Sequence, residues 1–315
     1  MNELITDATR NTQYATRNTQ YATRNTQHAT RNTQHATRNT QYAVRNTHWR
    51  LLRHGPATGA ENMAIDEAIG RAVAGRFVPP TLRFYAWEPP CLSVGRHQSL
   101  MAVDTTYCAA AGYHVVRRPT GGRAILHTDE LTYSIVAPPD HPLLAGLVLD
   151  SYLRLSHGLV DGLRRLGIAA EEAPGTNRAG PDVSAACFEV PSAYEIVANG
   201  RKLLGSAQAR RTDYVLQHGS LPLVGDLTRV VDCLALPSEA ERAELRRSLI
   251  AHAATVEALT GRQASLQEAA DALAAGFSAA LDMELIPGDL TPTERAWADE
   301  LVATKYGHPD WTERM

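Results

Sequence analysis

The segment Arg117-Arg-Pro-Thr-Gly-Gly-Arg-Ala-Ile-Leu-His127 places a glycine turn between two short apolar runs. The runs Val115–Arg118 and Ala124–His127 are typical of β-strands, with Pro119–Gly122 as the turn between them. Two adjacent glycines let backbone N–H groups approach a ligand, and the three arginines supply charge and hydrogen-bond donors. Neither the phosphate-loop spacing nor the dinucleotide fingerprint is present. The segment therefore predicts either a ligand-binding turn or an ordinary hairpin turn with solvated arginines.

Helix and strand patterns follow one another irregularly around this turn. Thr58-Gly-Ala-Glu61 is a capping box, which predicts a helix start, and Leu149–Leu166 has the apolar spacing of an amphipathic helix. Asn199-Gly200 suits the tight turn of a β-hairpin. Further runs predict strands, the first of them half-buried: Thr81–Trp87, Cys91–Gly95, Leu131–Ala137 and Tyr214–Leu221. Because helices do not regularly separate the strands, the sequence predicts an α+β fold with a mixed or antiparallel sheet and flanking helices.

The chain divides into a repeat segment and a body. Within residues 1–48, ATRNTQY or a close variant recurs every seven residues from Ala8 onward, and each repeat offers only alanine and one aromatic or histidine to bury. That apolar surface is too small to offset chain entropy, so a disordered tail is expected. Residues 49–315 are expected to form the folded domain. Its part from about residue 238 onward is expected to be helical, since further capping boxes begin at Ser238, Ser265 and Thr291.

Composition excludes several classes of protein. Of the 315 residues, 44% are hydrophobic and 21% are charged, which is the usual globular mix. No apolar run of about 18 residues and no signal-peptide pattern occurs, so no membrane association or export is expected. The net charge of −3 argues against a nucleic-acid-binding protein. The four cysteines form no CxxC pair, so we expect a reducing, cytoplasmic setting without a disulfide framework.

Three side chains are candidates for chemistry, and each has an ordinary structural alternative. Cys187 follows a Gly/Pro-rich loop at a strand junction, where a thiol can be reactive, although free cysteines are more often structural. Lys202 follows the Asn-Gly turn, and its ammonium either reaches solvent or is held for a reaction, for example to favour a thiolate. His127 either orients a substrate or is a buried histidine with satisfied hydrogen bonds. No metal-ligand spacing such as HExxH is present, so no metal site is expected. The Gly-x-Ser-x-Gly motif of a serine nucleophile is absent as well.

Several segments, taken in order, resemble the lipoate–protein ligase/octanoyltransferase family, which shares its catalytic fold with biotin–protein ligases. The similarity is carried by Asn62–Ala68, Leu82–Gln98, Arg117–His127, Gly200–Gln208 and Gln217–Leu221. It covers nearly all of residues 49–315 and none of the tail. The resemblance implies that residues 49–315 are an acyltransferase domain with the biotin/lipoate protein ligase fold.

Within this family, the sequence is most similar to the cysteine-dependent octanoyltransferases. ATP-dependent ligases usually have a third glycine in the turn, where this chain has Arg123, and they use no catalytic thiol. The resemblance implies Cys187 as the acyl-thioester nucleophile. It implies Lys202 as the cation that lowers the pKa of that thiol and hydrogen-bonds the acyl carbonyl. The implied substrate-binding residues are Arg118, Gly121, Gly122, Arg123, His127 and Gly205.

The implied reaction moves an octanoyl group from acyl carrier protein to a lysine of a lipoyl-accepting protein such as the glycine-cleavage H protein, the first step of endogenous lipoate biosynthesis. Passing from thioester to thioester to amide is downhill, so no ATP, metal or other cofactor is expected. A monomer is expected, with a basic patch for acidic partners formed by Arg117, Arg118, Arg210 and Arg211. Two alternatives remain, an ATP-dependent lipoate–protein ligase and an amidotransferase that moves octanoyl from the H protein to other lipoyl domains.

Overall fold

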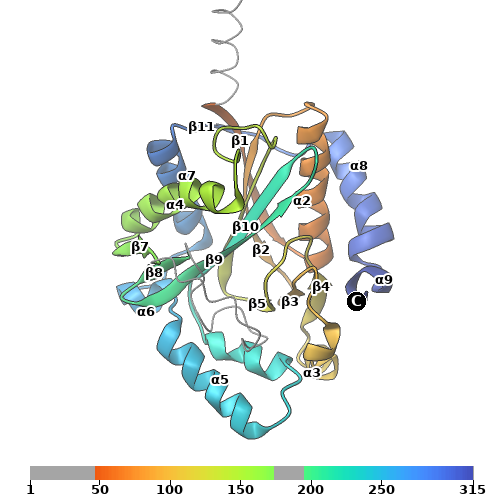
Figure 1. Ribbon diagram of the computed structural model, residues 1–315, viewed down its shortest axis with the longest axis vertical. Helices are drawn as coiled ribbons and strands as arrows, with labels where there is room; N and C mark the ends of the chain where they lie inside the picture. The colour runs from red at the N-terminus through yellow and green to blue at the C-terminus, as the bar shows by residue number, and fades with distance from the viewer. Residues whose placement is uncertain (1–46, 174–194, 315) are drawn as a thin grey trace, which may run out of the picture. The chain divides into compact units, whose positions relative to one another are not determined.

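A computed structural model describes residues 47–173 and 195–314 of the chain (Figure 1). The repeats up to residue 46 and the segment that holds Cys187 lie outside these ranges. Within them, strands and helices follow one another irregularly, and the predicted α+β fold class is confirmed. None of the helices in these ranges is long and apolar enough to cross a membrane.

Eight strands of the described residues form one mixed sheet, in the order β11-β1-β2-β6-β10-β9-β8-β7. β1 runs parallel to both of its neighbours, and the pairs from β2 to β7 are antiparallel. The strands of this sheet are β1 (His48–Ala57), β2 (Thr81–Trp87), β6 (Glu130–Ala137), β7 (Ala170–Glu172), β8 (Ile196–Ala198), β9 (Arg201–Arg210), β10 (Val215–Pro222) and β11 (Glu284–Pro287).

Helices cover both faces of this sheet (Figure 1). One face carries α2 (Gly59–Ala74) and α8 (Pro292–Leu301), and the other carries α4 (Val148–Arg165) and α7 (Leu266–Leu281). Leu82 and Phe84 of β2 pack in the core with α4 and α7, whereas Tyr85 and Trp87 pack with α2. The prediction that β2 is half-buried is therefore wrong, because α2 covers the face that was expected to meet solvent.

A second sheet of three strands, in the order β4-β3-β5, carries the glycine turn. β3 (Cys91–Val94) pairs in parallel with β4 (His114–Arg117) and antiparallel with β5 (Ile125–His127). The two strands that flank the turn therefore do not form a hairpin, because β3 lies between them. This sheet shares a core with η1 (Leu100–Ala102), α3 (Thr105–Ala110), η2 (Leu227–Cys233) and α5 (Glu239–His252).

Local signals set several boundaries as predicted. Thr58 caps α2 in a reciprocal capping box with Glu61. Between β8 and β9, Asn199 and Gly200 have φ values of 51° and 71°, as a type I′ turn requires. Three strands of the large sheet were not predicted, namely β1, β7 and β11. β11 lies in the part that was predicted to be helical, and it pairs there with β1. The remaining elements are α6 (Val256–Thr260), η3 (Val302–Tyr306) and α9 (Pro309–Thr312).

Candidate active site

Arg117 and Arg118 enter the glycine turn from the end of β4 with both side chains buried. The guanidinium of Arg117 donates to the carbonyl oxygens of Gly95, Gln98 and Thr312 at 2.8, 2.6 and 2.7 Å. A buried guanidinium needs such acceptors for its five donors. The alternative of a hairpin turn with solvated arginines is therefore wrong. Arg117 and Arg118 also cannot belong to the predicted basic surface patch.

Arg118 holds the turn in shape from the inside. Its Nε and Nη2 donate to the carbonyl of Gly121 at 3.1 and 2.9 Å, and Nη2 also donates to the carbonyl of Arg123 at 2.6 Å. Its Nη1 donates to the carbonyl and hydroxyl of Ser93 on β3 at 2.9 and 3.0 Å. Gly121 and Arg123 thus contribute main-chain oxygens that orient Arg118.

Two glycines allow the turn to lie directly against β3. A Cβ atom on Gly95 would lie 1.9 Å from the carbonyl oxygen of Gly122, a distance that only main-chain movement could relieve. Gly122 itself has a φ of 91°, in the region that side chains strongly disfavour. The close approach of these two backbones brings the turn to the edge of the cavity described next.

The turn, β5, β9 and β10 surround a cavity of about 570 Å³. Its lining includes four of the substrate-binding residues expected from the sequence, Arg118, Gly122, His127 and Gly205. Sequence reasoning did not assign a role there to the other lining residues, which are Met63, Trp87, Ser93, Ile125, Thr132, Glu195, Ser206, Ala207, His218, Gly219 and Ser220. Of the fifteen lining residues, eight have polar or charged side chains and seven are glycine or apolar, so the cavity offers both apolar surface and groups that can orient a ligand.

His127 forms part of one wall with both ring nitrogens engaged. Nδ1 lies 2.6 Å from Oε1 of Glu130, and Nε2 lies 2.7 Å from the hydroxyl of Ser93. The ring stacks on Trp87 with centroids 3.9 Å apart. Burial pushes the pKa of Glu130 up, but His127 and two hydroxyl donors outweigh it and leave that pKa below its usual range. The carboxylate therefore stays ionised and fixes the imidazole plane.

A buried polar network on α2 supports the opposite wall. His218 on β10 places Nε2 at 2.7 Å from the hydroxyl of Thr120 in the glycine turn, and its Nδ1 lies 3.8 Å from Asp66. Asp66 is fully buried and accepts hydrogen bonds from Arg83 and Ser134 at 2.7 and 2.8 Å. Burial lowers the pKa of His218, and Asp66 offsets this only in part, so the ring is neutral at pH 7. The network connects α2 to the turn through a neutral histidine.

Lys202 lies just behind the cavity, on β9. Its side chain is completely buried, and its ammonium lies 2.5 Å from Oε1 of Glu195, whose side chain is 10% exposed. A Cβ on Gly205 would lie 3.1 Å from Cε of Lys202, so this glycine leaves the space through which the lysine side chain runs. The alternative that the Lys202 ammonium reaches solvent is therefore wrong. The ammonium is held inside the protein, next to two residues that line the cavity.

The expected nucleophile, Cys187, lies outside the described residues, so its place in the site stays a prediction. The other three cysteines are buried and unpaired by disulfides, as expected for structural thiols. Burial raises the pKa of the Cys91 thiol far above its usual range, which keeps it protonated. Among the described residues, no cluster of three His, Cys, Asp or Glu side chains could hold a metal ion.

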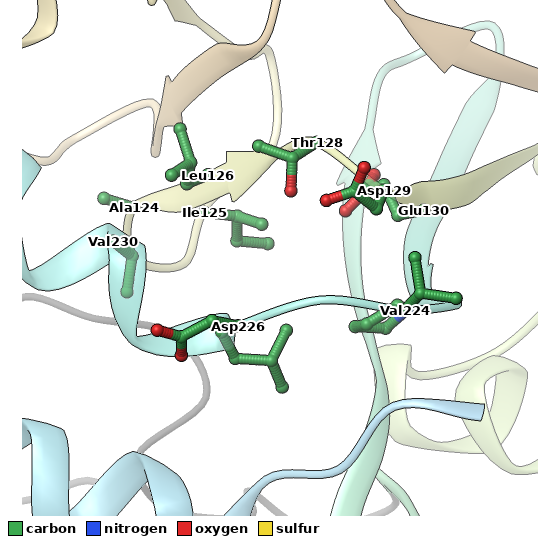
Figure 2. A pocket seen from close by; sticks show the side chains of 11 residues that line it. Ala124, Ile125, Leu126, Thr128, Asp129, Glu130, Val224, Asp226 and Val230 are labelled. Atoms are coloured by element: carbon green, nitrogen blue, oxygen red, sulfur yellow. The ribbon is translucent and has the colours of Figure 1, made fainter. Parts of the chain in front are cut away.

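A second cavity, of about 480 Å³, lies beside β5 (Figure 2). Its walls are β5 and the segment from Val224 to Val230, with Asp129 and Asp226 among its polar groups. Ile125 lines both cavities. Its side chain therefore forms part of the partition between them.

The sequence does contain a weak indication of the buried polar residues that the sequence analysis did not assign to the site. Asn62 and Asp66 are spaced four apart on a helix face that also carries apolar residues, which places two polar groups toward the core. Gln217, His218 and Ser220 interrupt an otherwise apolar strand in the same way. A buried polar group needs a partner, so such positions mark candidates for a site or a network.

Comparison with known proteins identifies the family. The model of the lipoyl protein ligase A/B catalytic domain matches residues 58–278. The chain belongs to this family. An octanoyltransferase LipM from Kyrpidia tusciae is 46% identical over 271 residues, which cover 84% of this chain and 98% of that protein. An octanoyltransferase LipM from Carboxydothermus hydrogenoformans is 43% identical, with 85% and 99% covered.

Solved structures agree with the family assignment. A bi-partite lipoate protein ligase from Thermoplasma acidophilum superposes with a TM-score of 0.72 at 26% identity, covering 85% of this chain and 96% of that one. A lipoate-protein ligase A bound with ATP superposes with a TM-score of 0.69 at 27% identity, covering 84% and 98%. The family resemblance inferred from the sequence motifs and the biotin/lipoate ligase type of fold are confirmed.

Proposed function

We propose that this protein transfers an octanoyl group to a lysine of lipoyl-accepting proteins through a thioester on Cys187. The donor is octanoyl-acyl carrier protein, and neither ATP nor a metal takes part. The choice of an octanoyl group is supported by the relatives named octanoyltransferase, which the chain matches over nearly their whole length. Arg118, Gly122, His127 and Gly205, which we propose bind the substrate, line the cavity, and the carbonyl oxygens of Gly121 and Arg123 accept hydrogen bonds from Arg118.

The observation that carries the proposal is the buried ammonium of Lys202 beside the cavity. An ammonium held within reach of a thiol lowers its pKa and increases the thiolate fraction, which is a few per cent for an ordinary cysteine at pH 7. The same ammonium can hydrogen-bond the acyl carbonyl oxygen, where negative charge develops during attack. Both roles need a fixed cation, and burial on a central strand fixes it.

The first half-reaction exchanges one thioester for another. The Cys187 thiolate attacks the donor thioester carbon, a new C–S bond forms, and the donor thiol leaves. In the second half-reaction the acceptor amine attacks the enzyme thioester, and the more stable amide makes this step favourable. Splitting the transfer in this way needs one nucleophile and no nucleotide. Arg123, where ATP-dependent ligases usually have a third glycine, favours this reaction over adenylation.

The test is to mix the enzyme with octanoyl-acyl carrier protein without an acceptor and to weigh it by mass spectrometry. One octanoyl mass should appear on the Cys187 peptide, and hydroxylamine should release it. Cys187→Ala should lose both the adduct and transfer to apo H protein, whereas Cys108→Ala, the matched control, should keep both. Transfer that requires ATP would favour the ligase instead. A rate higher with octanoyl-H protein than with the acyl carrier donor would favour the amidotransferase.

A further inference from the structure

Residues 309–314, which we call the C-terminal strap, lie against the strand that leads into the glycine turn. They comprise α9 and the two residues after it, and α9 packs beside β4 (Figure 1). The indole Nε1 of Trp311 donates to the carbonyl of Arg117 at 2.7 Å. The Arg117 guanidinium donates in return to the carbonyl of Thr312, from Nη2 at 2.7 Å and from Nε at 3.0 Å. The end of a chain usually frays unless it is held, and this reciprocal contact holds it.

Arg117 connects the strap to the glycine turn in two ways. Its main chain leads directly into the turn. Its Nη1 donates to the carbonyls of Gly95 and Gln98, which fixes the loop that follows β3. The turn is bonded to this loop, because the N–H of Arg96 donates to the carbonyl of Thr120 at 2.8 Å. A displacement of Arg117 would therefore move both the entry to the turn and the loop that supports it.

The strap is anchored on α2. The Trp311 ring packs edge-on against the Tyr306 ring, with centroids 5.5 Å apart, and the Tyr306 hydroxyl donates to Oε2 of Glu67 at 2.6 Å. The guanidinium of Arg314 lies over the Trp311 ring, 3.3 Å from its centroid. Glu67 directly follows Asp66, whose buried network reaches the turn from inside the protein. The same helix therefore supports the turn from within and holds the strap on its outer side.

The conformation of the turn matters for binding because Arg118 and Gly122 of the turn line the main cavity. Trp311 is not among the residues that line it. When the binding-competent conformation of a protein is only fractionally populated, the apparent affinity falls by that fraction. A contact that keeps the turn in its binding conformation therefore strengthens binding without touching the ligand.

We propose that Trp311 is a positioning residue for acyl binding, which acts through Arg117 to keep the glycine turn in the conformation that lines the cavity. The inference rests on the proposed function for the identity of the ligand, an octanoyl group. Because Trp311 lies outside the cavity lining, it sets the affinity for the acyl group and not the rate of the chemical steps.

The experiment uses Trp311→Phe, which removes the indole N–H and keeps an aromatic ring beside Tyr306. The ligand is the octyl thioether of pantetheine, which resembles the donor but has no carbonyl to attack. Its dissociation constant, measured by calorimetry, should rise about five- to ten-fold, as expected for the loss of one hydrogen bond to a buried group. The kcat at saturating octanoyl-acyl carrier protein should stay within about two-fold of wild type.

Hydrogen exchange read by mass spectrometry tests the turn without any ligand. Amides of residues 117–123 and 95–98 should exchange faster in Trp311→Phe, and the rest of the domain should exchange as in wild type. Trp297→Phe is the matched control, because it makes the same chemical change on α8, where the Trp297 ring packs against Phe77. This control should match wild type in affinity, kcat and exchange. A chain that ends at His308 removes both directions of the strap contact and should weaken binding more than Trp311→Phe does.

Wild-type affinity in Trp311→Phe overturns the inference. So does faster exchange spread evenly over the domain, which would mean a general loss of stability. A lower kcat with unchanged affinity overturns it as well, because Trp311 would then act on the chemical steps. Failure of the wild-type protein to bind the thioether or to form the octanoyl-enzyme would refute the proposed function instead, and exchange of residues 117–123 would still decide whether Trp311 holds the turn.

Discussion

Nη1 of Arg83 and Oδ1 of Asp66 lie 2.7 Å apart, and both side chains are completely buried. The pair joins β2 to α2 beneath the cavity. Burial alone would raise the pKa of Asp66, but the Arg83 charge and His218 outweigh it and leave that pKa below its ordinary value. The carboxylate therefore stays ionised in the core, where it also accepts hydrogen bonds from Tyr85 and Ser134.

Removing one member of this pair should be far more costly than removing an exposed one. Arg83→Met leaves a buried carboxylate without its cation, which should lower the free energy of unfolding by about 3–5 kcal/mol. Arg53→Met is the matched control, since Arg53 pairs with Asp271 at side-chain exposures of 41% and 56%. That change should cost less than about 1 kcal/mol. Urea unfolding of both variants measures the difference, and equal losses would contradict the assignment.

Stability should fall below pH 6.5 through His54. Its Nδ1 accepts a hydrogen bond from Nε of Arg83 at 2.8 Å, and burial and then the Arg83 charge lower its pKa to about 4. Below about pH 6.5 the unfolded chain takes up a proton that the folded protein refuses. The stabilisation is therefore fully present above pH 6.5 and is lost as the pH falls toward 4. One site of this kind contributes about 3 kcal/mol over that window.

His54→Asn keeps a hydrogen-bond acceptor but removes the titrating ring. The variant should show a flatter dependence of its unfolding free energy on pH between 6.5 and 4, by about 3 kcal/mol. His308→Asn is the control, because His308 lies in an exposed turn before α9. Its profile should follow that of the wild type. Parallel profiles for His54→Asn and wild type would show that His54 does not carry this pH dependence.

Local features were predictable because neighbouring residues alone determine them. The capping box at Thr58 and the type I′ turn at Asn199-Gly200 need only residues within the same few positions. The strand order was not predictable in this way. β3 separates β4 from β5, although the glycine turn joins those two strands directly in sequence. Pairing between strands depends on the surfaces that distant segments bury, and no local pattern records it.

Residues of the candidate site could be predicted where they belong to a sequence motif. Contacts between side chains from distant segments could not. Gly122 and Gly205 were identified, and the structure places both at the cavity. The Lys202–Glu195 and His218–Thr120 contacts join residues from separate segments. The prediction that Thr81–Trp87 is half-buried would leave Arg83 facing solvent, because alternation in β2 does not reveal that α2 brings Asp66 to meet it.

Ile125 should limit the length of the acyl chain. It lines both the main cavity and the second cavity, the latter drawn in Figure 2, so Ile125→Ala opens part of the partition between them. Each further methylene that becomes buried adds about 0.8 kcal/mol, or about four-fold in affinity. In competition between octanoyl and dodecanoyl donors, the variant should shift toward the longer chain. Leu126→Ala, which lines only the second cavity, should keep the octanoyl preference, and an identical shift in both variants would refute this role.

The last prediction concerns how Lys202 acts on the proposed nucleophile. Lys202→Met should move the pH profile for alkylation of Cys187 by iodoacetamide to higher pH, because it removes the cation that favours the thiolate. The same variant also removes the ammonium from the Glu195 carboxylate, and this anion would itself raise the pKa of a nearby thiol. The two effects must be separated before the shift is assigned to Lys202.

The double variant Lys202→Met/Glu195→Gln separates them, because it removes both charges together. A profile still displaced to higher pH means that the ammonium favours the thiolate directly, whereas a return to the wild-type profile means that Lys202 only neutralises Glu195. Lys305→Met is the control for loss of a paired lysine, since Lys305 contacts Glu67 at 2.6 Å away from the cavity lining, and it should leave the profile unchanged. Lys202→Arg should restore reactivity only in part, because a planar guanidinium cannot occupy the narrow space beside Gly205 as a point-like ammonium does.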